Sequence, residues 1–525
     1  MDSRYSMSRK SIASTALFLC LATFARAAPA PEPVVIPEAP VITPRPTKTS
    51  PQRRDIGSDI DSITSDIGSG ATSFTGELGS LATGGTNGIV PAALTSLPTG
   101  SEILSTLGIS SSDLDATPTS ALQRRPYGNF TDNGWQVRFN GFIYKTPNIS
   151  EDRLASYANA FVVGNYDELP ADEQANARNL TSEIFIVQQG NVQVTVDLVA
   201  GDQRESITLP YNTTDEGDFD VFVPLSGSHQ GDNANGGSTG TNAGGNSTGS
   251  LDFDDGNSTD RIQTFQSYVR GAADTGNATA YLVPAEGYTT ISDIDDILRV
   301  TKIYQPEQGL LNSFARPFTA WENMPEIYAN WSQSLPNMHF HYLTTTPEQG
   351  TRPYEDFIFK TYPEGSFDDR PLNFSNVDET TSPRKYLLDF IFQTFPKRKF
   401  NLIADTSNSD VMKDYPQMVT DFPGQVNCIW LRNTSATDGN DLFPYDTSGF
   451  KNINNDSYMF FLHPNDLMNL DIENGQCRNA TIPQNLTYDT QDEAAKDKLT
   501  GAASKTASGV GAFGLAVFVA IWNLV

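Results

Sequence analysis

The sequence predicts an α+β protein with two domains, an antiparallel β-sandwich-like domain followed by an α/β domain on a parallel sheet. Two observations lead to this prediction. Residues 126–285 contain alternating or β-branched runs separated by Gly, Asn and Asp, as is typical of antiparallel strands. Residues 286–480 alternate short apolar strands with amphipathic helices, as is typical of parallel strands joined by crossover helices. With 525 residues, the chain is long enough for both cores.

The first 27 residues have the pattern of a secretory signal peptide. A basic start is followed by the apolar run Ile12–Leu21 and then by Ala25-Arg26-Ala27, which resembles a cleavage site. The alternative is a membrane-spanning anchor, but the apolar run is shorter than the ~20 residues that a bilayer span needs. We therefore expect export through the secretory pathway, with residues 1–27 removed.

Residues 28–125 predict a disordered arm. They are rich in Pro, Ser, Thr, Gly and Ala and show no sustained helical or strand period, so they bury too little apolar surface to offset chain entropy. The pairs Arg53-Arg54 and Arg124-Arg125 could be processing sites, but we expect both to remain as uncleaved surface charge.

Residues 481–525 predict a linker and a signal for glycosylphosphatidylinositol (GPI) attachment. Small residues are followed by a short polar spacer and an apolar tail over 509–525. A permanent membrane helix is the alternative, but the tail is short and carries no basic stop. The expected attachment point is Gly501, Ala502 or Ala503. We therefore expect a lipid-anchored protein at the cell surface, on the plasma membrane or the cell wall.

Export also bears on the cysteines and on several asparagines. Cys20 would leave with the signal, so Cys428 and Cys477 remain and could form one disulfide in an oxidising compartment. Asn-x-Ser/Thr sequons fit the same route. The expected glycosylation sites are Asn129, Asn148, Asn179, Asn212, Asn277, Asn330, Asn433 and Asn485.

The charge balance excludes several classes of partner. The chain has 63 acidic and 35 basic residues, a formal net charge of −28, which argues against nucleic acid and against adsorption to anionic lipid headgroups. An anionic substrate would need a metal ion or a local basic pocket. His339 and His341 share one face of a predicted strand and could be a zinc pair, but with no third ligand nearby a structural role is favoured.

In the β-rich domain, the strand-like runs are interrupted by a flexible insert over residues 226–260. The expected strands cover residues 135–139, 184–187, 192–199, 219–223, 263–270 and 278–283. Two matches to G-x-S-x-G lie in the insert. A nucleophile elbow needs a strand before it and a helix after it, so no hydrolase serine is assigned there.

In the α/β domain, buried strands and amphipathic helices alternate. The expected strands cover residues 289–292, 339–343, 400–404 and 426–431. Apolar residues at helical spacing predict one helix around 324–331 and another from Pro383 to Phe395. Because parallel sheets carry their sites at the carboxyl ends of the strands, the residues after each strand are the candidates for function.

Two carboxylates directly follow the first of these strands. Asp293 and Asp295 fall in the loop after residues 289–292. A carboxylate at this place can attack phosphorus and form an aspartyl phosphate. A second carboxylate two residues on can donate a proton to the leaving oxygen. Neither works beside a phosphate dianion without a cation, so we expect Mg²⁺ with oxygen ligands.

The next strand–helix units each add a polar group. Thr344 and Thr345 end the second strand and supply donors for phosphate oxygens. Lys385 falls in the first turn of the next helix, where its charge could stabilise developing negative charge. The third strand ends at Asp405, with Asp410 shortly after it, and this pair could hold a metal ion. The order acid, hydroxyl, lysine, acid predicts a phosphatase site.

This order of motifs resembles that of haloacid-dehalogenase-type phosphatases. Residues 281–432 resemble more specifically the catalytic domain of the actin-patch-associated type of phosphatidate phosphatase. The resemblance runs through Tyr281-Leu-Val-Pro-Ala-Glu-Gly287, Ile291-Ser-Asp-Ile-Asp-Asp296, Arg316-Pro-Phe318, His341-Tyr-Leu-Thr-Thr-Thr-Pro347, Phe395-Pro-Lys-Arg-Lys-Phe400, Asp405-Thr-Ser-Asn-Ser-Asp410, Phe422-Pro-Gly-Gln-Val426 and Arg432.

The resemblance implies a haloacid-dehalogenase-like (Rossmannoid) catalytic domain that follows a strand-rich region, and Mg²⁺-dependent conversion of phosphatidate to diacylglycerol. It implies that Asp293 is the nucleophile, Asp295 the acid/base, Thr344 the phosphate-binding hydroxyl and Lys385 the stabilising lysine. The implied metal ligands are Asp293, Asp295, Asp405 and Asp410, and the implied substrate contacts are Thr345 and Arg432.

Departures from the family pattern leave three functions open. Ile297 stands where Thr normally ends the first motif, and Glu348 replaces a Trp, which would add repulsion for phosphate near the substrate entrance. The preferred function is an exported, lipid-anchored phosphatase of phosphatidate or another lipid phosphate. A non-catalytic cell-surface or wall protein on a degenerate phosphatase fold and a phosphatase of soluble phosphomonoesters are the alternatives.

Overall fold

The computed structural model describes residues 104, 107–162, 166–226, 251, 253, 254, 256, 261–370, 382–438 and 446–484 of the chain. All of them fall in one compact unit, Lys48–Val525. The expected signal peptide, the Arg53-Arg54 pair, most of the insert and the attachment residues Gly501, Ala502 and Ala503 lie outside the described residues. In the part of the chain that is described, no helix has the length and apolarity to cross a bilayer.

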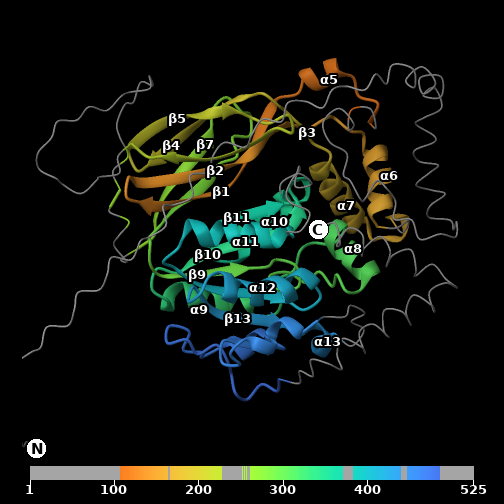
Figure 1. Ribbon diagram of the computed structural model, residues 1–525. Coiled ribbons are helices and arrows are strands. Elements are labelled where there is room, and N and C mark those ends of the chain that lie inside the picture. The colour runs from red at the N-terminus through yellow and green to blue at the C-terminus, as the bar shows by residue number, and fades with distance from the viewer. Residues whose placement is uncertain are drawn as a thin grey trace, which may run out of the picture. The chain divides into compact units, whose positions relative to one another are not determined.

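The first sheet is mainly antiparallel and contains eight strands within the described residues, in the order β3-β2-β1-β8-β7-β4-β5 with β6 paired to β2 (Figure 1). These strands are β1 (Thr119–Thr131), β2 (Gly134–Lys145), β3 (Val187–Gln188), β4 (Gln193–Ala200), β5 (Gln203–Asn212), β6 (Asp218–Pro224), β7 (Gln263–Val269) and β8 (Ala278–Val283). Strands β1 and β8 run parallel. The expected sandwich of two separate sheets is wrong, because β1 pairs with β2 and, at residues 127–129, also with β8, which joins all strands in one sheet.

The described residues include several before residue 126, where the sequence predicted a disordered arm, and these residues form a helix and a strand. Helix α5 (Ser111–Asp115) starts at Ser110, whose side chain accepts a hydrogen bond from the Asp113 amide. Strand β1 follows and contains both Arg124 and Arg125. Arg124 is 3% exposed, so the expectation that this pair is surface charge is wrong for Arg124.

Two helices between β2 and β3 were also not predicted, α6 (Glu151–Phe161) and α7 (Ala171–Ile184). Their apolar side chains form a small core of their own, which includes Tyr157, Phe161 and Ile184. The expected strand over 184–187 is therefore mostly wrong, because Ile184 ends α7 and β3 begins only at Val187.

The second sheet is parallel, with the strand order β11-β10-β9-β12-β13-β14 in the described part of the chain. Its strands are β9 (Tyr288–Ser292), β10 (His339–Pro347), β11 (Ser366–Arg370), β12 (Lys399–Asp405), β13 (Val426–Arg432) and β14 (Tyr458–Phe461). The four predicted strands are present, and the two edge strands β11 and β14 were not predicted. The chain direction across the sheet reverses between β9 and β12, and such a switch point opens a crevice at the carboxyl ends of the two strands.

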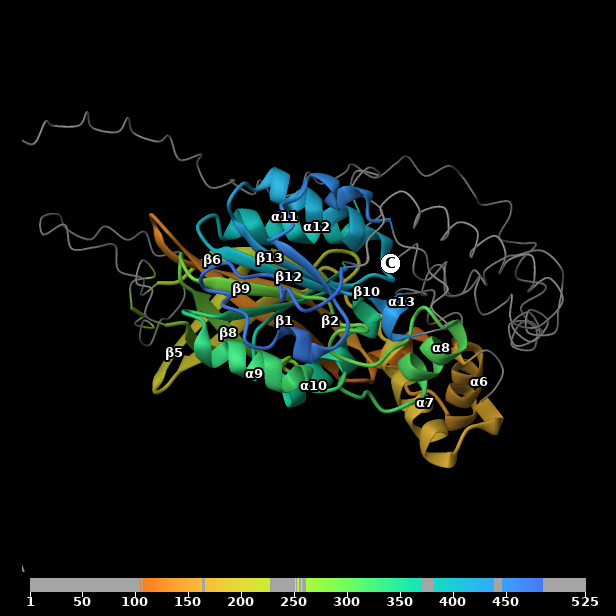
Figure 2. The same cartoon turned by 90° about the horizontal axis from the view of Figure 1, so that it is seen from below.

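Helices cover both faces of the parallel sheet, with α11 and α12 on one side and α9 and α10 on the other (Figure 2). The helices of this domain are α8 (Pro306–Phe314), α9 (Met324–Ser334), α10 (Arg352–Thr361), α11 (Pro383–Thr394), α12 (Ser409–Asp421) and α13 (Thr434–Thr437), with 3-10 turns η3 (Glu348–Gly350), η5 (Ser448–Asn452) and η6 (Pro464–Leu467). Successive strand residues alternate between the two cores: Ile403 packs toward α9, while Leu402 and Ala404 pack toward α11. The first sheet also contributes to the core between the parallel sheet and α11, through Tyr127, Tyr281 and Val283.

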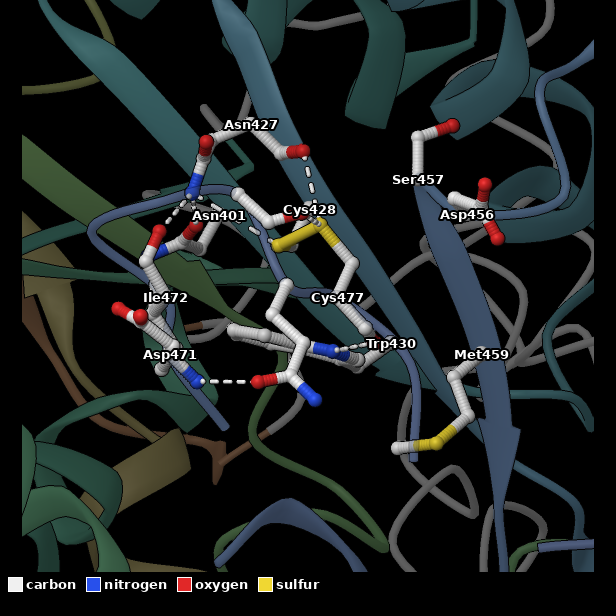
Figure 3. Close-up of a disulfide and its surroundings, with 12 residues drawn as sticks. Asn401, Asn427, Cys428, Trp430, Asp456, Ser457, Met459, Asp471, Ile472 and Cys477 are labelled. Atoms are coloured by element: carbon white, nitrogen blue, oxygen red, sulfur yellow. Dashed lines mark hydrogen bonds between the residues drawn. A yellow bond between two sulfur atoms is a disulfide. The ribbon is translucent and has the colours of Figure 1, made fainter. Parts of the chain in front are cut away.

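A disulfide joins Cys428 in β13 to Cys477, as the sequence had suggested (Figure 3). The Cα atoms are 5.2 Å apart and the bond closes a separation of 49 residues. Trp430 donates its indole N–H to the Cys477 carbonyl at 2.8 Å, and Asn427 donates to the Ile472 carbonyl at 3.1 Å. The disulfide thus fixes the segment after β14 against the start of β13.

Candidate active site

Two carboxylates lie at the switch point of the parallel sheet. Asp293 directly follows β9, and Asp405 is the last residue of the neighbouring strand β12. Asp293 is 4% exposed and Asp405 is fully buried. The Asp293 amide donates to the Ile403 carbonyl at 2.9 Å, which holds the loop after β9 against the end of β12. The sheet therefore brings these two predicted residues together.

Asp293 faces one cation. Arg384 Nη2 in α11 lies 3.3 Å from Asp293 Oδ2, and the Ile294 amide donates to Asp293 Oδ1 at 3.0 Å. Burial raises the pKa of Asp293 to about 6, against the opposing effect of Arg384 and with a further increase from Asp295. A buried carboxylate with a guanidinium beside it suits a nucleophile that must accept an incoming dianion.

Asp295 is held by three donors. Arg299 Nε and Thr301 Oγ1 donate to its Oδ1 at 2.7 and 2.6 Å, and Tyr354 in α10 donates to its Oδ2 at 3.1 Å. Arg299 is fully buried, and its Nη2 also donates to the Tyr354 hydroxyl at 2.9 Å. The position of this carboxylate thus depends on α10 as well as on its own loop.

Asp296, to which the sequence analysis gave no role, organises the loop after β9. Its backbone adopts φ = 59°, and its carboxylate accepts the amides of Thr301, Lys302 and Ile303. Arg432 at the end of β13 donates Nη1 to the Asp296 carbonyl at 2.8 Å. Arg432, a predicted substrate contact, therefore binds the backbone of this loop and holds it at the end of β13.

Asp405 has one satisfied oxygen and one free oxygen. Its Oδ2 accepts the Ser407 amide at 3.0 Å and the Ser407 hydroxyl, while its buried Oδ1 has no hydrogen-bond partner in the described part of the chain. Burial raises the pKa of Asp405 well above its usual value, and the charges of Asp296 and Asp293 raise it further. A buried carboxylate oxygen without a donor, near two other carboxylates, fits an oxygen-liganded cation.

The remaining predicted metal ligand, Asp410, lies in the first turn of α12, which is capped by Asn408. Burial alone would lower the pKa of Arg384, but Asp293, Tyr415 and Asp410 raise it, so Asp410 acts on the same guanidinium as Asp293. Within the described residues, no three His, Cys, Asp or Glu side chains converge closely enough to form a ready metal site.

The predicted hydroxyls lie near the end of β10, the strand that pairs with β9 on the side away from β12. Thr344 and Thr345 are both buried, and Thr344 Oγ1 accepts the Thr346 amide at 3.1 Å. Their strand thus ends beside the loop that carries Asp293.

Lys385 does not face Asp293, so its predicted place in the site is wrong. Its Nζ pairs with Asp389, one turn further along α11, and with Asp421 at 2.9 Å. Helical geometry explains the difference: Arg384 shares the buried face of α11 with Leu387 and Leu388, so the basic side chain that turns inward is Arg384. The spacing of the apolar residues in α11 already indicates that Arg384 lies on the buried face of the helix.

The two departures from the family pattern have structural roles. Ile297 is fully buried in the core between the sheet and α9. Glu348 is also fully buried, and its Oε2 accepts Nη2 of Arg124 at 2.7 Å. The expected repulsion of phosphate by Glu348 is therefore wrong, because its buried carboxylate pairs with Arg124. The two histidines have the structural role that was favoured over a zinc pair. His339 and His341 are buried and contact Ser366 and Asp368 of β11.

The sequons differ in accessibility. Those with exposed asparagines are Asn148, Asn179, Asn212, Asn277 and Asn330. Asn129 donates its side-chain amide to the Thr394 carbonyl at 3.0 Å, and Asn433 caps α13, so both asparagines already use their side chains. Asn485 lies outside the described residues.

Comparison with known proteins identifies the segment that carries these residues. Residues 288–433 match the family described as Phosphatidate phosphatase APP1, catalytic domain. The match begins with β9 and ends just after β13, so it includes Asp293, Arg384 and Asp405. The chain is also 25% identical over 201 residues to Phosphatidate phosphatase APP1 of Saccharomyces cerevisiae, which covers 37% of this chain and 34% of the yeast protein. The similarity thus spans about a third of that relative.

Proposed function

We propose that this chain is a Mg²⁺-dependent phosphomonoester hydrolase that forms an aspartyl phosphate on Asp293, with a lipid phosphate of the phosphatidate kind as its substrate. The observation that carries the proposal is the pairing of Asp293 with Arg384 at the switch point, beside the free buried oxygen of Asp405. The match of residues 288–433 to a phosphatidate phosphatase catalytic family supports the substrate class.

In the first half of the reaction, an Asp293 carboxylate oxygen attacks phosphorus while the bond to the leaving oxygen breaks. Asp295 gives a proton to that oxygen. Arg384 and the donors at Thr344 and Thr345 stabilise the negative charge on the transferring group. In the second half, Asp295 takes a proton from water as it attacks the phosphorus, which releases phosphate and restores Asp293.

The metal would be held by Asp293, Asp405 and Asp410, with Asp295 close by. When bound, Mg²⁺ would neutralise charge on the phosphate and on the crowded carboxylates. The free Oδ1 of Asp405 is the atom that fits this role best, since a buried acceptor without a donor is otherwise costly.

The direct test measures phosphate release by the whole chain with Mg²⁺, next to Asp293→Asn. The control is Asp356→Asn, an exposed carboxylate of α10 that pairs with Lys360 and lies outside the site. We expect release by the wild type and by Asp356→Asn, and none by Asp293→Asn. Equal release from all three proteins would refute the assignment of Asp293. No release from any of them over a broad substrate panel would favour the non-catalytic surface protein.

A second comparison separates a lipid phosphatase from an enzyme of soluble phosphomonoesters. Micellar phosphatidate and short, water-soluble phosphomonoesters are offered at equal phosphate concentration. A strong preference for the micellar substrate supports a lipid phosphate, and the opposite preference assigns the soluble class.

We also propose that the protein is exported, glycosylated and GPI-anchored at the cell surface. The end segments of the sequence and the exposed sequons support this location. Release of the protein from cells by a phosphatidylinositol-specific phospholipase C would support the anchor, and retention after that treatment would contradict it.

A further inference from the structure

The two sheets meet at a buried group of ion pairs. Arg124 of β1 donates Nη2 to Glu348 at 2.7 Å, and its Nε pairs with Asp369 of β11. Its Nη1 donates to Asn140 of β2 at 2.8 Å. All three ionic side chains are buried, and β1 and β2 lie against β11 and α10 in the fold (Figure 1). A single guanidinium therefore ties the first sheet to two acidic groups of the second domain.

The acidic partners of Arg124 hold the start of α10. Asp369 Oδ2 accepts the hydroxyl of Thr351 at 2.8 Å, and the same hydroxyl lies 2.8 Å from the Glu348 carbonyl. Thr351 precedes the first residue of α10, and its carbonyl accepts the amide of Tyr354 at 2.9 Å. The first turn of α10 is thus fixed to β11 and, through Arg124, to the first sheet.

Tyr354 completes the connection to the site. Its hydroxyl donates to Asp295 Oδ2 at 3.1 Å and accepts from Arg299. From Arg124, the line of contacts runs through Asp369, Thr351 and Tyr354 to the carboxylate that the proposed mechanism uses as acid and base.

We propose that Arg124 is a positioning residue for catalysis, through which the first sheet sets the place of Tyr354 and so of Asp295. This inference rests on the proposed function, because it concerns the proton that Asp295 gives to the leaving oxygen. It makes the first sheet a part of the catalytic unit, although the family match covers only residues 288–433.

A second arginine provides a matched control. Arg138 of β2 is as buried as Arg124 and donates Nη1 to Asp368 at 2.8 Å, across the same interface. Asp368 contacts His341 in β10 and Tyr127 in β1, neither of which lies in α10. Arg138 thus holds the two domains together, and its hydrogen bonds within the described residues go to Asp220, Tyr127 and Asp368 rather than to the first turn of α10. Arg270 is an exposed control, because its guanidinium group binds Asp197 within the first sheet and does not reach the described residues of the second domain.

The experiment compares Arg124→Lys, Arg138→Lys and Arg270→Lys in the whole chain. Lysine keeps the charge but cannot bind two carboxylates and an amide in one plane. Each variant is assayed with an aryl phosphate such as p-nitrophenyl phosphate, whose leaving group needs little protonation, and with an alkyl phosphate, whose leaving group needs the acid. We expect Arg124→Lys to lower kcat/KM for the alkyl phosphate about tenfold and kcat/KM for the aryl phosphate less than about twofold, because kcat/KM reports the step in which the leaving oxygen departs and not the later step in which Asp295 acts as base. The other two variants should keep the ratio of the two rates.

A double variant tests the route. If Arg124 acts through Tyr354, then Arg124→Lys combined with Tyr354→Phe should lose no more of the alkyl rate than Tyr354→Phe alone. Hydrogen exchange gives a readout without turnover: amides 351–356 should exchange faster in Arg124→Lys than in Arg138→Lys.

The outcomes separate the two proposals. A wild type that cleaves neither of these two phosphates nor micellar phosphatidate refutes the proposed function and this inference with it. An active Arg124→Lys with an unchanged ratio of rates, or with unchanged exchange at 351–356, overturns the positioning role alone. Equal loss of both rates in Arg124→Lys and Arg138→Lys would also overturn it, since that pattern reports only loss of folded protein.

Discussion

Arg384 Nη2 lies 3.3 Å from Asp293 Oδ2, while Lys385, the next residue of α11, pairs with Asp389 and Asp421. The neighbouring basic side chains thus leave the helix in different directions, and only the arginine reaches the buried carboxylate. A planar guanidinium can also form two parallel hydrogen bonds to phosphate oxygens, which an ammonium group cannot.

Separate substitution of Arg384 and Lys385 tests which of the two side chains stabilises the transition state. We expect Arg384→Met to lower kcat about 100-fold or more, as the loss of a single preorganised charge donor does. Lys385→Met should keep kcat within about twofold, because it removes only partly exposed ion pairs. Phosphate release per folded protein measures both. A large loss in Lys385→Met with little loss in Arg384→Met would restore the predicted stabilising role of the lysine.

Asp405→Asn should have opposite effects on stability and on metal binding. Asp405 is buried among the charges of Asp293 and Asp296, so the neutral amide should raise the free energy of unfolding without metal by about 1 kcal/mol or more. The same change removes the free oxygen that fits Mg²⁺, so the metal should no longer raise the melting temperature. Thermal unfolding with and without Mg²⁺ tests both parts. A variant that is destabilised without metal, or that keeps the full Mg²⁺ effect, would contradict this account.

Glu355 of α10 should make the protein less stable as pH rises. Burial, and to a smaller extent the charge of Asp369, raises its pKa from 4.5 to about 8, against the opposing effect of Arg125 and Arg124. Because the folded state then binds the proton more tightly than the unfolded state, this stabilisation is complete below about pH 4.5 and is lost as pH rises through 8. Between pH 6 and 8 the loss should be on the order of 2 kcal/mol.

Denaturant unfolding at the two pH values measures this slope. Glu355→Gln should flatten it, while Asp356→Asn, the exposed neighbour in the same helix, should leave it unchanged. An equal slope in wild type and Glu355→Gln would show that other groups cause the pH dependence.

The disulfide should stabilise the fold without affecting turnover. Closing a separation of 49 residues restricts the unfolded chain, so replacing both cysteines by alanine should cost about 4 kcal/mol. Cys428 lies near the start of β13, whereas the site lies at the carboxyl ends of the strands, so kcat per folded molecule should stay unchanged. Urea unfolding and phosphate release of Cys428→Ala/Cys477→Ala test the two statements. A lower kcat in fully folded variant would contradict the second.

The parallel sheet could be predicted because short runs rich in β-branched, aromatic and aliphatic residues alternate with amphipathic helices along the chain. The edge strand β11 has the sequence Ser-Phe-Asp-Asp-Arg, and so many charged residues are typical of a loop. They fit a buried strand because Arg124 and Arg138 of the first sheet neutralise Asp369 and Asp368. The single first sheet could not be distinguished from a sandwich, since both give the same alternation along each strand.

The positions of the site residues could be predicted from the sequence, but most of their hydrogen-bond partners could not. Asp293 and Asp295 come just after a strand, Asp405 ends one and Thr344 lies near the end of another, so their places are fixed by the local pattern. The partners of Asp295 come from 4, 6 and 59 positions along the chain, and such a distant contact leaves no mark on local composition. Arg384 is the exception, because the apolar period of α11 already places it on the buried face.

Arg124 and Asp369 are 245 residues apart, and this separation has a consequence for biosynthesis. The first sheet ends with β8 at Val283, so it is complete before β11 has been synthesised. Arg138 can pair at that stage with Asp220 of the same sheet, whereas Arg124 can reach Asn140 but must wait for residue 369 to meet its carboxylate partner in β11. Docking of the two sheets through Arg124 is therefore a late step of biosynthesis.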